Sequence, residues 1–134
     1  MSNNPRIIQL SRFLDRRGNL SVIEEMKDIP FEIKRAYWVY DVPGGESRKG
    51  HAYHKSHELI VALSGSFDVV TDQGSDPQTF SLNRSYYGLY VPCGVWRQLT
   101  NFSTNSLALI LTSTPYTPKD YIYSRKEYLE IVSK

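Results

Sequence analysis

Short hydrophobic runs alternate with polar breaks along most of this chain. The runs are rich in β-branched, aromatic and aliphatic residues, recur about every eight to twelve positions, and end at Gly, Pro, Asn, Asp or Ser. They predict strands at 6–11, 19–24, 34–41, 50–54, 57–63, 66–71, 78–82, 86–91, 96–101 and 106–112. Helical crossovers would need more chain between the runs, so the pattern predicts an antiparallel sandwich or barrel.

Two segments depart from this alternation. The run Leu59–Leu63 is apolar at every position, which is typical of a strand buried on both faces. Such a strand fits between the core and a subunit interface. The final segment, "RKEYLEIVSK", carries apolar residues at Tyr128, Leu129, Ile131 and Val132, so we expect a short C-terminal helix docked on the strands.

Length and composition limit the class of protein. A chain of 134 residues with 40% hydrophobic content supports one core, so residues 1–134 are expected to form a single domain. The 16 basic and 14 acidic residues are scattered, which gives no basic stripe for nucleic acid. The single cysteine, Cys93, excludes an internal disulfide, and we treat it as structural. The first residues lack a signal-peptide core and no run is long enough to span a membrane, so we expect a soluble, cytoplasmic protein.

The stretch "RKGHAYHKSHELIVALSGSF" contains all three histidines of the chain. Side chains two apart in a strand share a face, so His51 and Tyr53 form a pair and His54 points the other way. The spacing of Gly45, His51, Glu58 and Gly65 matches the first motif of the cupin superfamily, except that Tyr53 replaces its second histidine.

A second cupin motif follows with the same kind of replacement. "PCGVWRQLTN" keeps the proline, glycine and asparagine of the motif, but Arg97 stands where the histidine is expected. Of the residue types that bind metal in cupins, only His51 and Glu58 remain, and a permanently cationic arginine has no lone pair to donate. We therefore expect no metal, the alternative being recruitment of His54 or His57 in another geometry.

Without a metal, His51 is either a hydrogen-bonded core residue or an acid–base group. Imidazole titrates near neutral pH, and here it has a tyrosine and an arginine beside it. That combination suits a reaction that forms an enolate without a metal.

Four longer blocks resemble one family of cupins. "RRGNLSVIEE", "IPFEIKRAYWVYDVPGG", "HKSHELIVALSGSFDVV" and "LNRSYYGLYVPCGVWRQLTNFSTNSLALILTSTPYTPKDYI" are similar to the dTDP-4-oxo-6-deoxyglucose 3,4-ketoisomerases, a family also described as WxcM-like. The likeness runs from about residue 8 to 130. It implies an all-β cupin with a jelly-roll β-barrel, usually a homodimer, that needs no cofactor.

The resemblance also implies a reaction. The family moves the carbonyl of a thymidine-diphosphate sugar from C4 to C3 through an enediol or enediolate, on the way to an amino sugar of a bacterial surface glycan. Its signature Arg-Gly-x-His-Ala-His is matched here at Arg48, His51 and Ala52, with Lys49 in place of the glycine.

The tyrosine at position 53 leaves three readings open. His51 is the principal base and Tyr53 donates to the enolate oxygen; or Tyr53 is itself the acid–base group; or the isomerase activity is altered or lost. An unperturbed tyrosine, with a pKa near 10, is a poor base at neutral pH unless nearby arginines depress that value. His54 and His57 are expected at the surface or behind the site.

A nucleotide sugar needs cations for its diphosphate and flat apolar surfaces for its rings. Tyr37 and Tyr40 are expected near the pocket mouth. The predicted site is catalytic His51 and Tyr53, with substrate held by Arg17, Tyr40, Arg48, Tyr90 and Arg97.

Two other functions remain possible from the sequence. A dTDP-sugar 3,5-epimerase also works through an enolate and a histidine, but it leaves the carbonyl at C4. A non-catalytic cupin that binds sugar nucleotides is compatible with Tyr53. Carbonyl migration in the product separates the isomerase from both.

Overall fold

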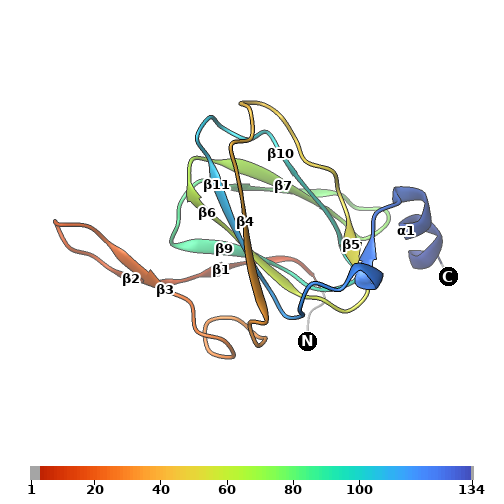
Figure 1. Ribbon diagram of the computed structural model, residues 1–134, viewed down its shortest axis with the longest axis horizontal. Coiled ribbons are helices and arrows are strands. Elements are labelled where there is room, and N and C mark those ends of the chain that lie inside the picture. Colours follow the sequence, from red (N-terminus) through yellow and green to blue (C-terminus); the bar gives the residue numbers. More distant parts are fainter. Residues whose placement is uncertain (1–3, 134) are drawn as a thin grey trace.

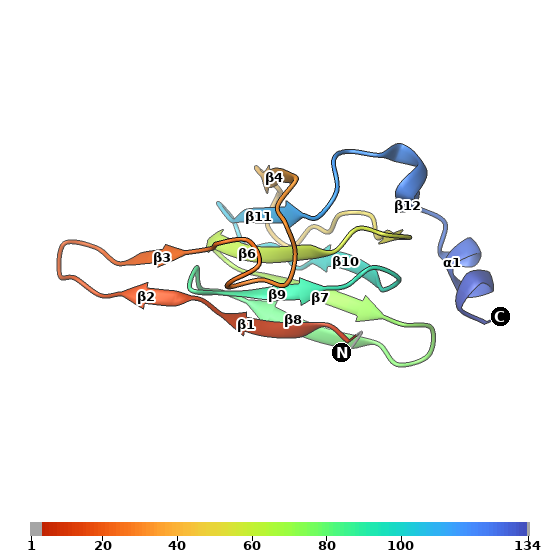
Figure 2. The ribbon, with the colours of Figure 1, turned by 90° about the horizontal axis from the view of Figure 1, so that it is seen from below.

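The computed structural model describes residues 4–133 as two facing antiparallel sheets with a short C-terminal helix (Figures 1 and 2). The larger sheet has the strand order β1-β9-β6-β11-β4, and the smaller has the order β10-β7-β8. Their strands are β1 (Arg6–Gln9), β4 (Arg35–Tyr40), β6 (Glu58–Ser64), β7 (Phe67–Asp72), β8 (Gln78–Leu82), β9 (Tyr87–Val91), β10 (Trp96–Thr100) and β11 (Leu107–Thr112).

Two short pairs complete the strands. β2 (Ser11–Phe13) and β3 (Leu20–Val22) form a hairpin that extends away from the two sheets, at the left of Figures 1 and 2. β5 (Ala52–Tyr53) pairs with β12 (Tyr121–Ile122) at the opposite end, beside helix α1 (Arg125–Val132). A 3-10 turn at Pro118–Asp120 leads into β12.

The main core lies between the two sheets. Ile60, Leu89 and Ile110 from the larger sheet meet Phe67 and Val69 from the smaller one, all with at most 2% of their surface exposed. Such a core contributes about 25 cal/mol for each Å² of apolar surface removed from water. A second apolar cluster covers the outer face of the larger sheet, so the two faces of β6 are both packed.

The predicted all-β antiparallel class and the C-terminal helix are confirmed. All ten predicted strands overlap observed ones, but the run predicted at 6–11 is broken at Leu10, and a second strand begins at Ser11. The two-residue strand β12 was missed, because a pair of residues shows no periodicity. The residues that the structure describes do not close into one continuous barrel; the two sheets stay separate.

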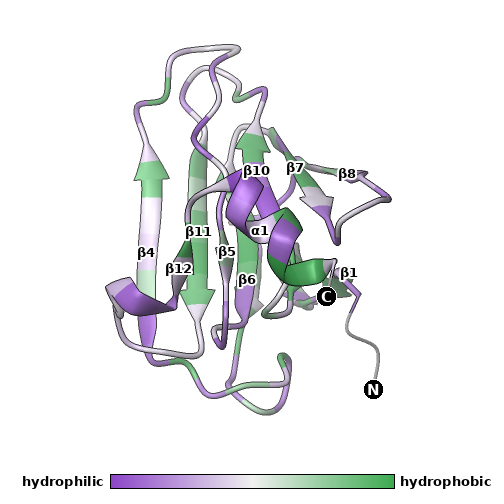
Figure 3. Cartoon of the chain, turned by 90° about the vertical axis from the view of Figure 1, so that its right-hand side faces the viewer, coloured by the Kyte–Doolittle hydropathy of each residue, from purple (hydrophilic) through white to green (hydrophobic). Residues whose placement is uncertain are grey.

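Two packing predictions need correction. Burial of the central strand on both faces holds only from Leu59 to Ala62, because Leu63 is 43% exposed near the strand end. In α1 only Tyr128 is buried, while Leu129, Ile131 and Val132 are partly exposed. Figure 3 shows the hydrophobic residues along β6 and β11, and α1 beside β5. No helix in the described range is long and apolar enough to cross a membrane.

Candidate active site

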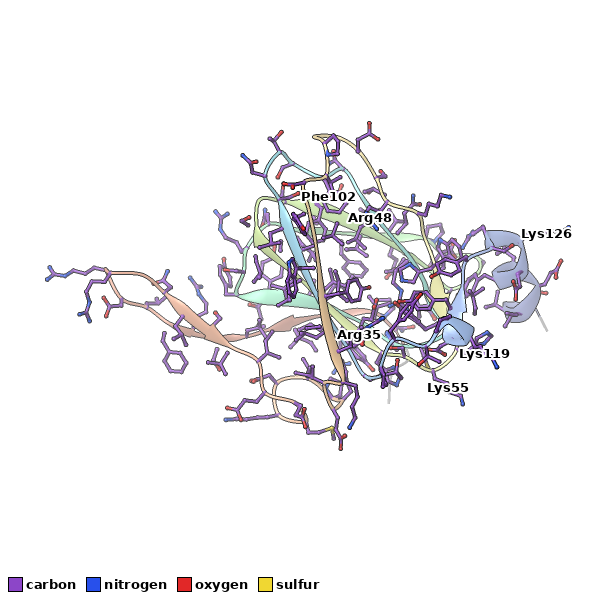
Figure 4. The ribbon with its side chains drawn as sticks, in the orientation of Figure 1. Arg35, Arg48, Lys55, Phe102, Lys119 and Lys126 are labelled. Atoms are coloured by element: carbon purple, nitrogen blue, oxygen red, sulfur yellow. The ribbon has the colours of Figure 1, made fainter. Side chains whose placement is uncertain are left out.

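A cavity of about 790 Å³ opens between β4, the loop before β5, and the C-terminal segment. The larger sheet supplies its apolar floor through Ile60 and Ile110. Basic side chains line it on opposite sides: Arg35 begins β4, and Arg48 lies in the loop before β5 (Figure 4). Its other polar and aromatic lining residues are Tyr37, Trp38, Tyr40, Ser47, Lys49, His51, Glu58, Arg97, Tyr121 and Tyr123.

His51 is fixed in this cavity through its backbone. Its N–H donates to the Arg97 carbonyl and its own carbonyl accepts from Arg97 N–H, both at 2.9 Å. The ring makes a hydrogen bond with the Lys49 backbone, and the buried Nε2 atom has no hydrogen-bond partner in residues 4–133. The ring therefore lines the cavity and carries one buried nitrogen that no protein group in the described range occupies.

The environment of His51 favours the neutral imidazole. Burial, and next the nearby Arg97 cation, lower the pKa of His51 to about 4, although Glu58 and the Lys49 backbone act in the opposite direction. A neutral imidazole at pH 7 has a free lone pair and can accept a proton. His51 is thus in the protonation state that a general base requires.

Glu58 and Arg97 form a buried ion pair behind the cavity. Arg97 is 0% exposed and its Nη1 lies 2.7 Å from Glu58 Oε1. Arg97 also donates from Nη2 to the Val95 carbonyl at 2.9 Å, and Tyr37 donates its hydroxyl to Glu58 Oε2 at 2.8 Å. Each Glu58 oxygen therefore has a donor, which offsets the cost of burying the two charges.

Tyr53 lies behind the cavity wall. It is 1% exposed, its ring centroid is 5.0 Å from that of His51, and the Arg97 guanidinium carbon is 5.0 Å from its ring centroid. The shared face of His51 and Tyr53 is as the alternation predicts. Burial, and then the negative charge of Glu58, raise the pKa of Tyr53 well above its ordinary value. Its hydroxyl stays protonated at neutral pH, so this site disfavours Tyr53 as a base.

The rim of the cavity is aromatic and cationic. Tyr121 and Tyr123 are stacked with ring centroids 5.0 Å apart, and the His51 ring lies 5.5 Å from that of Tyr121. Arg35 donates to the Tyr121 hydroxyl at 3.0 Å and lies over the Tyr37 ring. Together with Arg48 and Lys49, Arg35 places three cations around the cavity, as a diphosphate ligand would require.

Of the seven predicted site residues, four line the cavity, Tyr53 lies behind its wall, and two lie elsewhere. His51, Tyr40, Arg48 and Arg97 line the cavity, whereas Arg17 and Tyr90 do not. Arg17 lies in the extended β2–β3 hairpin, largely exposed and paired with Asp15 at 2.9 Å. The hairpin carries it away from the two sheets, a placement that spacing along the chain does not reveal.

Tyr90 belongs to a separate cluster on the other face of the larger sheet. Its ring stacks on Phe31, and its hydroxyl is 3.4 Å from Nδ1 of His57. His57 Nδ1 also accepts from the Cys93 backbone N–H at 3.0 Å, which places His57 away from the cavity. His54 is exposed at the surface. The expected bystander positions of His54 and His57 agree with this arrangement.

The sequence assigned no role to Arg35 or Val39 and placed Tyr37 only near the pocket mouth, yet all three line the cavity. Arg35, Tyr37 and Val39 face inward because they alternate along β4 with exposed neighbours. Alternation over 34–41 was the available signal, although it does not show which face is internal. Tyr121 reaches the site through the strand β12, which the sequence did not predict.

The two potential metal ligands kept from the first cupin motif lie in a setting that disfavours a cation. Glu58 is held by Arg97 and Tyr37, and His51 lies near the same arginine cation. In residues 4–133 no group of three His, Cys, Asp or Glu side chains could hold a metal ion. The Glu58 carboxylate therefore belongs to a hydrogen-bonded network with Arg97 at its centre, and the His51 ring lies near that network.

Comparisons with known proteins agree with this geometry. The family model "WxcM-like, C-terminal" matches residues 3–133. The TDP-4-oxo-6-deoxy-alpha-D-glucose-3,4-oxoisomerase of Aneurinibacillus thermoaerophilus is 36% identical over 129 residues, covering 96% of this chain and 93% of that protein.

Solved structures extend the likeness to three dimensions. The sugar 3,4-ketoisomerase QdtA from Thermoanaerobacterium thermosaccharolyticum, in complex with TDP, superposes with a TM-score of 0.94 at 31% identity, covering 99% of this chain and 97% of that one. The rmlC epimerase of Mycobacterium tuberculosis shares the fold at a TM-score of 0.76 and 17% identity, covering 89% of this chain and 68% of that one. The predicted cupin-like fold is thereby confirmed, and the chain belongs to the WxcM-like family, whose relatives include sugar-nucleotide 3,4-ketoisomerases.

Proposed function

We propose that this protein is an isomerase that moves the carbonyl of TDP-4-oxo-6-deoxyglucose from C4 to C3. The observation that carries the proposal is the neutral His51 imidazole, which has an unpartnered Nε2 and lines a cavity that cationic and tyrosine side chains also line. The 36% identity to a TDP-4-oxo-6-deoxyglucose 3,4-oxoisomerase supports the same reaction and substrate class.

In the proposed mechanism His51 carries one proton between two carbons. Nε2 removes the proton from C3 of the sugar, and the C4 oxygen takes up a proton as the C3–C4 enediol forms. The protonated His51 then returns its proton to C4, while the hydroxyl at C3 loses its proton and becomes the carbonyl. Bonds and protons balance, because the C4 carbonyl becomes a hydroxyl and the C3 hydroxyl becomes a carbonyl.

The negative charge that develops on the sugar oxygens requires nearby positive charge or hydrogen-bond donors. Arg35, Arg48 and Lys49 line the cavity and supply positive charge for both the enediolate and the diphosphate. Burial raises the pKa of Tyr37, so its hydroxyl remains protonated beside the carboxylate to which it donates. We assign these residues to binding and charge stabilisation, and His51 to proton transfer.

The direct test is incubation with TDP-4-oxo-6-deoxyglucose in deuterated water, with the product identified by NMR. A ketoisomerase gives a 3-oxo sugar, and deuterium appears at C4 to the extent that the proton on His51 exchanges with solvent before it is returned. The same preparation carrying His51→Asn is the matched control and should give no product at the same enzyme concentration. A product that keeps its carbonyl at C4 and exchanges at C3 and C5 would instead indicate a 3,5-epimerase, and binding without turnover would indicate a non-catalytic cupin.

We also propose that the protein is a homodimer. The outer face of the larger sheet leaves Trp38 59%, Tyr40 62% and Leu63 43% exposed, around a shallow apolar groove that Leu107 and Leu109 complete. Contiguous apolar surface of this kind marks interaction sites, and a second copy of the chain is the occupant predicted from the sequence. Sedimentation equilibrium at micromolar concentration should give twice the 15.4 kDa chain mass, and a monomer would contradict the proposal.

The biological setting predicted from the sequence belongs to this proposal too. A 3-oxo sugar nucleotide is a substrate for amino transfer. This fits the synthesis, in the cytoplasm, of a deoxyamino sugar destined for a surface polysaccharide. Loss of that amino sugar from the glycan of a strain that lacks this protein would support the assignment.

A further inference from the structure

The strand that directly follows the proposed base His51 is held largely by the C-terminal segment. β5 contains only Ala52 and Tyr53, and its partner is β12. The Asp120 carboxylate then accepts from the backbone N–H groups of Lys55 at 2.8 Å and Ser56 at 3.1 Å. Such a short strand has few hydrogen bonds of its own, so its position depends on these contacts.

Helix α1 adds a clamp through Trp96, which packs in one apolar cluster with Tyr128 and with Ala52 of β5. Tyr128 is 1% exposed, and its hydroxyl lies 2.9 Å from the Gly94 carbonyl oxygen and 3.0 Å from that of Asp72. The Tyr128 ring packs on Trp96 with centroids 5.6 Å apart, and the Arg125 guanidinium lies over the same indole. Arg125 also forms an ion pair with Asp72 at the end of β7. The helix therefore fixes the indole of Trp96 from two of its turns.

Trp96 in turn lies in close contact with the backbone next to His51. A Cβ built on Gly50 would lie 2.6 Å from Trp96 Nε1 and 2.8 Å from Cε2, so only a glycine allows this approach. Gly50 lies between His51 and Lys49, the residue whose backbone bonds the His51 ring. A displaced indole would therefore move the backbone that sets the orientation of the ring.

We propose that Tyr128 and Trp96 are positioning residues, which hold the Lys49–Gly50 backbone so that His51 Nε2 points into the cavity. The inference rests on the proposed function, in which His51 transfers the proton. Helix α1 would then position the base, although its other apolar residues are partly exposed and contribute little to the core. A displacement of about 1 Å at a reacting group costs about 100-fold in rate, so small shifts of this backbone matter.

Two substitutions perturb the clamp from opposite sides. Tyr128→Phe keeps the ring but removes the hydroxyl, and kcat should fall about tenfold with little change in KM. Gly50→Ala places a methyl group against the indole, and kcat should fall about 100-fold. Gly50 does not have a left-handed φ, so alanine does not strain the backbone there.

Matched controls separate positioning from folding. Tyr87→Phe also removes a bonded hydroxyl, 2.7 Å from Asn83 Oδ1, and Gly44→Ala also creates a close contact, 2.9 Å from Thr104 Oγ1. Neither site is near His51 in the chain or lines the cavity. Both controls should lower Tm while leaving kcat within about twofold of the wild type.

An NMR titration of the His51 ring gives a readout that does not need turnover. In both clamp variants the pKa of His51 should move by at least about half a unit, because the ring changes its position relative to Arg97 and the Lys49 backbone. Unchanged kcat and an unchanged His51 titration, together with a lowered Tm, would overturn the inference. A wild-type protein that binds the sugar but does not isomerise it would refute the proposed function instead, and the titration would still decide whether the clamp positions His51.

Discussion

Acidification should destabilise the protein through His51 before its carboxylates are fully protonated. Burial and Arg97 lower the pKa of this imidazole from 6.5 to about 4 in the folded chain, whereas the unfolded chain retains the ordinary value. Between these two values the unfolded state binds more protons, so the free energy of unfolding falls as the pH decreases. The contribution of His51 is fully present above pH 6.5 and is lost progressively as the pH approaches 4.

The size of the effect follows from the two pKa values. At pH 4.5 protonation favours the unfolded over the folded chain by a factor of roughly 100, which corresponds to about 2–3 kcal/mol. At pH 7.5 the same term is below about 0.1 kcal/mol. A loss of this size is a large part of the 5–15 kcal/mol that holds a typical domain folded.

Denaturant unfolding of the wild type and His51→Asn at pH 7.5 and 4.5 isolates this term. Asparagine does not titrate, so the wild type should lose about 2–3 kcal/mol more than the variant between the two pH values. Burial also lowers the pKa of His57, but His57 is present in both proteins, so its contribution to the free energy of unfolding cancels in the comparison. Equal losses in the two proteins would refute the reasoning that burial and Arg97 keep His51 neutral.

Three further predictions test other parts of the site. Tyr53→Phe should lower kcat by less than about tenfold, because a hydroxyl that stays protonated is no base. His51→Asn should lower kcat by about 100-fold or more. Equal losses of kcat in steady-state assays would restore Tyr53 as the acid–base group. Glu58→Gln should reduce the free energy of unfolding by about 3–5 kcal/mol, because it leaves the buried Arg97 charge without its partner. A loss below about 1 kcal/mol in chemical denaturation would show that the pair is not effectively buried. Arg48→Ala should weaken TDP binding about tenfold in calorimetry, and the dependence of affinity on salt should become shallower. An unchanged affinity would exclude Arg48 from the diphosphate site.

The sequence identified the parts of the site whose positions follow from strand alternation. His51 and Tyr53 are two residues apart, so their shared face could be predicted without knowing the fold. Arg97 was linked to His51 only through motif spacing, and the structure shows the reason: His51, just before β5, forms an antiparallel bridge with Arg97 of β10 through both backbone groups.

The alternatives for Tyr53 could not be separated from the sequence. Its pKa depends on burial and on the nearby Glu58 carboxylate, which the chain places next to it only after folding. The same applies to Arg17 and Tyr90, which the predicted site included. One lies in an extended hairpin and the other on the opposite face of the larger sheet, and neither direction is encoded in local spacing.

Hydrophobic periodicity and turn residues determined the strands, the antiparallel class and the capped C-terminal helix, because these depend on neighbours along the chain. The motif residues around His51 determined the family. Tertiary structure alone decided the protonation states and the support of the base. Electrostatic and packing energies depend on distance in space, and the residues concerned lie far apart in sequence. Examples are the burial of His51, the ion pair between Glu58 and Arg97, and the close contact between Trp96 and Gly50.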